Sequence, residues 1–150
     1  MRKLCLVCSS GGHLFQLYSL KDFWSGKDRF WVSFPTSDAR YLLKNERKYW
    51  AHYPTNRNAK NLLKNFFLAL KILKKQKPDI VISTGAGIGV PFIFLGRIFG
   101  MKTIYLESIT RNEELSLSAR LVYLYVNKLL VQWPELEHKY KRVEFQGQVL

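Results

Sequence analysis

The stretch PDIVISTGAGIGVPFIFLGRIFGMKTIYLES, residues 78–108, decides the fold. Residues 79–83 and 103–107 are short, mainly apolar runs, typical of strands that are buried on both faces. The residues between them, 90–99, predict a helix, because Pro91 suits its first turn and Gly100 follows its end. A strand, a helix and a second strand in this order indicate two parallel strands that are joined across one face of a sheet.

The same alternation continues in both directions along the chain. Further apolar runs predict strands at residues 3–8, 29–34 and 129–133, with a less hydrophobic edge strand at 48–53. Helical spacing predicts helices directly after the first strand and at residues 39–43, 58–77 and 117–126. We therefore expect one α/β domain over residues 1–150, a Rossmann-like parallel sheet with helices on both faces.

The composition is that of a globular protein with an unusual surplus of positive charge. Apolar residues make up 47% and charged residues 23%, which argues against disorder. The 24 lysines and arginines exceed the 11 acidic residues and give a net charge of +13. Such a chain attracts phosphate-rich partners, which include nucleic acid, anionic lipid headgroups and pyrophosphate compounds. The long apolar run at 88–99 is broken by Pro91, Gly96 and Arg97, so we expect no spanning helix.

Two cysteines, Cys5 and Cys8, have the C-x-x-C spacing of many metal and redox sites. Because both lie in a predicted strand, residues three apart point to opposite faces of the sheet. We therefore interpret both cysteines as small apolar core residues of a reducing compartment.

The predicted helix at 58–77 combines an apolar stripe with a basic flank. The stripe follows helical spacing and comprises Ala59, Leu62, Leu63, Phe66, Phe67, Leu70 and Leu73. Lysines gather beside it, which suits contact with an anionic membrane surface as well as a core helix with a solvated outer face. The candidate membrane contacts are Lys60, Lys64, Phe67 and Lys71.

Glycine-rich loops follow two of the predicted strands. The first loop comprises Ser9, Ser10, Gly11, Gly12 and His13; the second contains Thr84, Gly85 and Gly87. Glycines let backbone N–H groups approach an anion, and ligands of open parallel sheets bind beyond the carboxyl ends of the strands. Ser9 and Ser10 offer hydroxyl groups, and a histidine such as His13 can transfer a proton near neutral pH.

A third loop follows the strand at 103–107 and contains Glu107 and Arg111. A carboxylate in this place suits sugar hydroxyls or the orientation of a base, while Arg111 suits a phosphate. An equally good interpretation makes Glu107 a structural partner of Arg111 or of loop N–H groups. The pattern G-x-G-x-x-G is missing from the first loop, and no acidic residue ends the second strand, which disfavours a dinucleotide cofactor.

The chain resembles a family of glycosyltransferase subunits. The motif SSGGH at 9–13 is similar to the first glycine-rich loop of the bacterial N-acetylglucosaminyltransferase that makes peptidoglycan lipid II. It is closer to the membrane-anchor subunit of the eukaryotic dolichol-pathway enzyme and closest to bacterial accessory subunits for capsular and exopolysaccharide synthesis. The run 78–108, the segment LVQWP at 130–134 and Gly147 also match this family.

The resemblance implies the amino-terminal half of a GT-B glycosyltransferase that is divided between two chains. Such a half binds a sugar linked to undecaprenyl diphosphate at the cytoplasmic face of the membrane, and a partner subunit binds the UDP-sugar. It implies no metal and no cofactor, with peripheral attachment, since the eukaryotic subunit's amino-terminal membrane helix has no counterpart here. His13 and Glu107 are then the candidate catalytic residues. The candidate acceptor and phosphate contacts are Ser9, Ser10, Gly11, Gly12, Thr84, Gly85, Gly87 and Arg111.

Two other functions compete with this one. A non-catalytic scaffold would recruit and activate the partner, and its cleft residues would be dispensable. A small basic nucleic-acid-binding domain would display basic residues between exposed aromatic ones. The aromatic residues here fall mainly in predicted strands and in the helical stripe, so we expect no nucleic-acid partner. The donor sugar and its linkage stay open, with galactose, glucuronic acid and N-acetylglucosamine as candidates.

Overall fold

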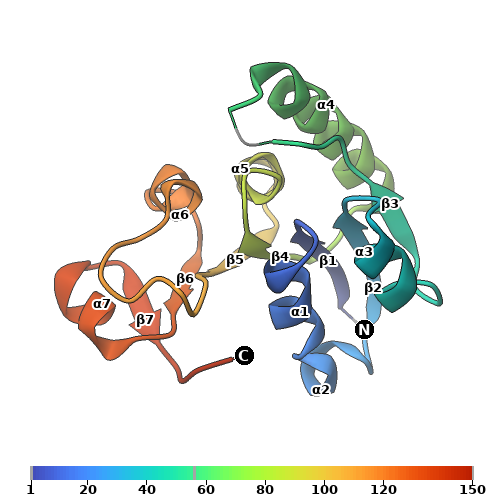
Figure 1. The fold of residues 1–150 in the computed structure, drawn as a ribbon. Helices are drawn as coiled ribbons and strands as arrows, with labels where there is room; N and C mark the ends of the chain where they lie inside the picture. Colours follow the sequence, from blue (N-terminus) through green and yellow to red (C-terminus); the bar gives the residue numbers. More distant parts are fainter. Residues whose placement is uncertain (1, 56, 150) are drawn as a thin grey trace.

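The structure, a computed structural model, describes residues 2–55 and 57–149 and contains a seven-stranded sheet (Figure 1). Every strand pair is parallel, and the order is β3-β2-β1-β4-β5-β6-β7. The strands are β1 (Lys3–Cys8), β2 (Asp28–Ser33), β3 (Lys48–Trp50), β4 (Ile80–Gly85), β5 (Lys102–Leu106), β6 (Lys128–Val131) and β7 (Val143–Phe145). The predicted Rossmann-like fold class is confirmed.

Helices cover both faces of the sheet (Figure 1). They are α1 (Gly12–Tyr18), α2 (Lys21–Trp24), α3 (Ser37–Leu42), α4 (Ala59–Gln76), α5 (Gly89–Ile98), α6 (Leu117–Val122) and α7 (Pro134–Lys139). Buried residues of α1, α2 and α3 join one core cluster, and those of α4, α5 and α6 join the other. None of the helices that the structure describes is long and apolar enough to cross a membrane.

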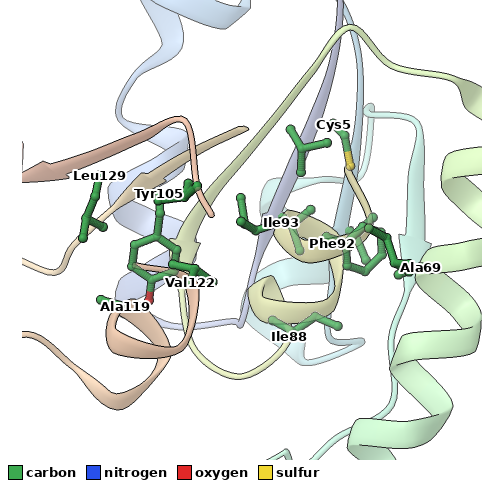
Figure 2. Close-up of a cluster of buried hydrophobic side chains, with 14 of the residues drawn as sticks. Cys5, Ala69, Ile88, Phe92, Ile93, Tyr105, Ala119, Val122 and Leu129 are labelled. Carbon is green, nitrogen blue, oxygen red and sulfur yellow. The ribbon is translucent and has the colours of Figure 1, made fainter. Parts of the chain in front are cut away.

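The larger core lies between the sheet and the layer formed by α4, α5 and α6. Figure 2 shows Phe92 and Ile93 of α5 at its centre, with Ala69 of α4 on one side and Val122 of α6 on the other. The alternation of strand side chains divides the two cysteines between the layers, since Cys5 joins this core and Cys8 the opposite one. Both thiols are buried and free, as predicted.

Several elements differ from the sequence prediction. The edge strand β3 ends at Trp50 rather than at residue 53, and α6 ends at Val122 rather than at residue 126. The helices α2 and α7 and the strand β7 were not predicted. They are elements of three to six residues, too short for apolar periodicity to stand out.

The predicted apolar stripe of α4 is divided between the core and the surface. Leu73 is buried, and Phe66 and Leu70 pack against the larger core. The residues buried toward the sheet are Asn65, Ala69, Ile72 and Leu73, whereas Leu62, Leu63 and Phe67 are exposed. Asn65 helps to set the orientation of the helix: its amide exchanges two hydrogen bonds with the backbone of His52, at 2.8 and 2.9 Å, and so ties α4 to the loop after β3. A buried amide with both partners satisfied costs little and fixes the helix orientation.

Candidate functional site

The two glycine-rich loops lie side by side at the centre of the sheet. They follow β1 and β4, which pair with each other although the chain passes through β2 and β3 between them. The strand order reverses at this point, because the chain first builds outward from β1 and then returns to its other side. Such a switch point is where open α/β sheets bind ligands. The predicted placement of these loops at one carboxyl edge is confirmed.

A reciprocal pair of hydrogen bonds joins His13 to Thr84. The Thr84 hydroxyl donates to the backbone carbonyl of His13 at 2.7 Å, and His13 Nδ1 lies 2.9 Å from the backbone carbonyl of Thr84. Because a carbonyl oxygen only accepts, Nδ1 carries the proton of a neutral ring. Nε2 is then the ring nitrogen with a free lone pair. The two loops therefore fix both the position and the tautomer of this half-buried histidine.

Gly85 leaves room for the His13 ring. Its φ of +125° lies in the region that favours glycine, and a Cβ at this position would lie 3.0 Å from His13 Nδ1 and 3.0 Å from the Tyr105 hydroxyl. Tyr105 is buried between β5 and α6, close to Ala119 and Val122 (Figure 2). Burial raises the pKa of Tyr105 well above its ordinary value, and the nearby Glu107 charge raises it further. The Tyr105 phenol is therefore uncharged near neutral pH, and it borders the site beside Gly85.

Two other glycines of the second loop have different surroundings. A Cβ on Gly89 would lie 2.1 Å from the Ser83 hydroxyl oxygen, so this glycine allows α5 to start against β4. A Cβ on Gly87 would lie 3.5 Å from Thr55 of the loop after β3. The loops after β1, β3 and β4 thus meet around residues 84–87.

The first loop is open on its outer side. A Cβ on Gly11 or on Gly12 would meet nothing within 4 Å, although Gly11 has a φ of +75°. The Gly11 N–H already donates to the Asp38 carboxylate at 2.7 Å. The hydroxyl of Thr36 and this N–H both lower the pKa of Asp38, the hydroxyl having the larger effect. The loop therefore holds a carboxylate from its own chain. Ser9 and Ser10, which start the loop, are half-buried, and the Ser9 hydroxyl faces the Ser10 carbonyl at 3.4 Å.

Glu107 organises the third loop. It is 1% exposed, and its two carboxylate oxygens accept from the backbone N–H groups of Ser108, at 3.0 Å, and of Ser116, at 2.7 Å. These contacts match the structural interpretation in which loop N–H groups are its partners. Arg111 is exposed in the same loop, and its backbone N–H donates to the Ser108 carbonyl at 3.0 Å. Glu107 thus fixes the path of the loop that carries Arg111.

Two buried glutamines support the same edge. Gln132, fully buried after β6, donates to the Glu107 carbonyl at 3.0 Å, and Gln16 of α1 approaches that carbonyl at 3.4 Å. The Gln132 side-chain oxygen accepts from the Val149 N–H. Sequence reasoning missed the parts played by Gln16, Gln132, Asp38 and Tyr105. A polar residue at the end of an apolar run, as in LVQWP, is the signal that could have identified Gln132.

Comparison with known proteins identifies the family. Residues 43–149 match the family described as "Oligosaccharide biosynthesis protein Alg14 like". The chain belongs to the Alg14-like family. The "UDP-N-acetylglucosamine transferase subunit alg14" of Schizosaccharomyces pombe is 39% identical over 75 residues, which cover 47% of this chain and 36% of that protein. The Homo sapiens subunit ALG14 is 34% identical over 95 residues, 59% of this chain and 44% of that protein. The chain thus aligns with less than half the length of these curated relatives.

Solved structures agree on the fold. MurG of Acinetobacter baumannii superposes with a TM-score of 0.78 at 18% identity, over 98% of this chain and 45% of MurG. A UDP-N-acetylglucosamine 2-epimerase of Rickettsia bellii gives 0.75 at 12% identity, over 99% of this chain and 45% of the epimerase. The Alg14-like chain therefore has the fold of about half of each of these larger proteins.

Proposed function

We propose that this chain is the acceptor-binding subunit of a two-chain GT-B glycosyltransferase in bacterial capsular or exopolysaccharide synthesis. A partner subunit binds the UDP-sugar, and the pair transfers a hexose to a sugar on undecaprenyl diphosphate. Membership of the Alg14-like family and the half-length match to MurG support a chain that acts with a second domain. The observation that carries the proposal is the His13–Thr84 pair at the switch point.

His13 is the proposed general base. Nδ1 is occupied by the Thr84 carbonyl, so Nε2 takes the proton of the acceptor hydroxyl while that oxygen bonds to the anomeric carbon. The bond from that carbon to the UDP oxygen breaks, and UDP leaves with the bonding electrons. Such a base contributes about 10²–10⁴-fold to the rate. In this mechanism Glu107 is a positioning residue, because its carboxylate accepts hydrogen bonds from the Ser108 and Ser116 N–H groups and so holds the third loop in place.

The remaining residues of this edge form the proposed binding surface for the acceptor. The first loop supplies Ser9, Ser10, Gly11 and Gly12, which precede His13 in the chain. The second loop supplies Thr84 and Gly85, which lie against the His13 ring, and Gly87, which lies beside Thr55. The open space over Gly11 and Gly12 leaves the backbone accessible to a diphosphate. Because the Gly11 N–H already donates to Asp38, a diphosphate there displaces that carboxylate or binds beside it. Arg111 supplies a positive charge from the third loop.

The outer face of α4 is the proposed contact with the cytoplasmic face of the membrane. Leu63 and Phe67 are each 59% exposed there, and Lys60, Lys64 and Lys71 are exposed beside them. Exposed apolar side chains with a basic flank favour adsorption to anionic lipid without spanning it. The orientation of α4 supports this proposal, because it leaves Phe67, a predicted membrane contact, outside the core.

A mixed complex tests the function. We expect His13→Ala to lower hexose transfer from UDP-galactose, UDP-glucuronic acid or UDP-N-acetylglucosamine by about 10²-fold or more. His138→Ala, an exposed histidine of α7, is the matched control and keeps full transfer. Partner recruitment, measured separately by co-purification, stays intact in both variants. Full transfer by the His13→Ala complex would remove the proposed base and favour a non-catalytic scaffold.

A further inference from the structure

Two arginines converge on one turn at the edge of the sheet opposite to His13. Arg97, in the last turn of α5, donates through Nε to the Tyr125 carbonyl at 3.1 Å. Arg142, just before β7, donates through Nη1 to the Leu124 carbonyl. These carbonyls belong to neighbouring residues, so both guanidinium groups lie beside the turn at residues 124–125. Each guanidinium keeps further N–H donors, because arginine has five and uses one here.

Both arginines line one open cavity of about 450 Å³. Its other walls are Ile98, Tyr125, Asn127 and the loop at 124–126. Within residues 2–55 and 57–149, the ion pairs involve Arg29, Arg47, Arg120, Lys128 and Lys139 but neither Arg97 nor Arg142. Two like charges in one cavity repel each other, and an anion between them removes that cost. A phosphate group suits two forked guanidinium donors better than it suits lysines.

Apolar side chains surround the mouth of this cavity. Leu124 is 75% exposed and Ile98 is 60% exposed, and both line the cavity itself. Phe94 of α5 is partly exposed and packs its ring against that of Tyr125, which lines the cavity, with the ring centroids 5.4 Å apart. Leu121 of α6 is also exposed. These helices lie in the same layer as α4 (Figure 1). A ligand that places phosphate between the arginines therefore brings apolar groups against Ile98 and Leu124, as a phospholipid does.

We propose that the Arg97–Arg142 cavity binds the phosphate of an anionic lipid headgroup. The site goes beyond the proposed function, because it lies at the amino ends of the strands, away from the switch point. It orients the chain on the membrane through a specific contact, whereas α4 supplies apolar adsorption. The two contributions can be separated by experiment.

Vesicle binding tests the site with three variants of the full chain. The Arg97→Gln/Arg142→Gln variant should bind vesicles of phosphatidylcholine and phosphatidylglycerol about thirtyfold more weakly than the wild type. This factor corresponds to the loss of about 1 kcal/mol of binding free energy for each of the two charges. The control Lys21→Gln/Lys44→Gln loses the same charge from exposed positions on the other side of the sheet and should weaken binding about threefold or less. The variant Arg97→Lys/Arg142→Lys keeps the positive charge but lacks the paired N–H donors of the guanidinium groups. Its affinity for the vesicles should fall nearly as far as that of the glutamine variant.

Two comparisons separate the sources of phosphate and the role of α4. Inorganic phosphate should release the wild type from these vesicles more effectively than chloride at equal ionic strength. The α4 variant Leu63→Ser/Phe67→Ser should weaken binding both to the mixed vesicles and to vesicles of pure phosphatidylcholine. The arginine variants should bind pure phosphatidylcholine as the wild type does. Equal binding by the lysine variant and the wild type would overturn the proposal, because diffuse attraction would then suffice. If inorganic phosphate releases the wild type but the glutamine variant binds vesicles as tightly as the wild type does, the lipid assignment is overturned. Unchanged melting temperatures of the variants confirm that each is folded.

Discussion

Gly85→Ala is the substitution that most directly probes how the second loop holds His13. The new methyl group would lie 3.0 Å from His13 Nδ1 and from the Tyr105 hydroxyl, at a φ of +125°. The backbone costs about 1–3 kcal/mol, as for other non-glycine residues in sparsely populated conformations. Crowding adds about 1–3 kcal/mol, as for an extra methylene in a filled core. Together these lower the melting temperature by roughly 4–24 °C for a chain of this size.

Gly147→Ala is the matched control. Gly147 has a φ of +114°, close to that of Gly85, but a Cβ there meets nothing within 4 Å. The backbone N–H groups of Phe145 and Val149, on either side, are held by Glu137 and Gln132, so this backbone has little freedom to relax. The control therefore carries the backbone cost of about 1–3 kcal/mol without the crowding. The difference between the two variants isolates the contact with His13 and Tyr105.

Thermal unfolding and ¹⁵N NMR of the histidine ring measure the two consequences. We expect Gly85→Ala to melt at a lower temperature than Gly147→Ala and to change the ring signals of His13, because the ring leaves the Thr84 carbonyl. Gly147→Ala should keep the wild-type signals, with the proton on Nδ1. Equal melting temperatures together with unchanged His13 signals in Gly85→Ala would refute the description of this site.

Two further predictions concern buried groups. Glu107→Gln replaces a carboxylate that accepts two backbone N–H bonds, and it should lower the free energy of unfolding in urea by about 1.5–3 kcal/mol; the exposed Glu113→Gln is its control, and equal midpoints would contradict the anchoring role of Glu107. Burial raises the pKa of the Cys8 thiol to about 12 and that of Cys5 well above its ordinary value, so at pH 8 only about one Cys8 in 10⁴ is thiolate. Both thiols should therefore resist a disulfide reagent at pH 8 until the chain is unfolded, and fast labelling of the native protein would show that this core is open.

The central strands could be predicted from the sequence because their signal is local. Strands such as DIVIS and TIYLE are buried on both faces, and continuous apolar runs reveal this without any knowledge of their neighbours. The orientation of α4 could not be predicted in the same way. Leucine and phenylalanine at helical spacing look alike whether they face the sheet or the outside, and Asn65 takes an inward place only because His52 offers its backbone.

For the candidate site, too, the local features could be predicted from the sequence, whereas the contacts between residues far apart in the chain could not. Glycine-rich turns after two strands are visible in the sequence, and a switch point follows once the strands are ordered. The contact of His13 with Thr84 spans 71 residues and depends on the pairing of β1 with β4. The loop N–H partners of Glu107 likewise depend on how residues 108–116 fold back, which no spacing encodes.

Ligand binding by this chain alone tests most directly whether it is the acceptor half of the enzyme. Calorimetric titration would compare a short-chain polyprenyl diphosphate-linked sugar with UDP-N-acetylglucosamine, UDP-galactose and UDP-glucuronic acid. We predict that the polyprenyl compound binds, that Arg111→Gln weakens this binding, and that the UDP-sugars give no heat. Binding of a UDP-sugar without binding of the polyprenyl compound would contradict the assignment and would make this chain the donor half.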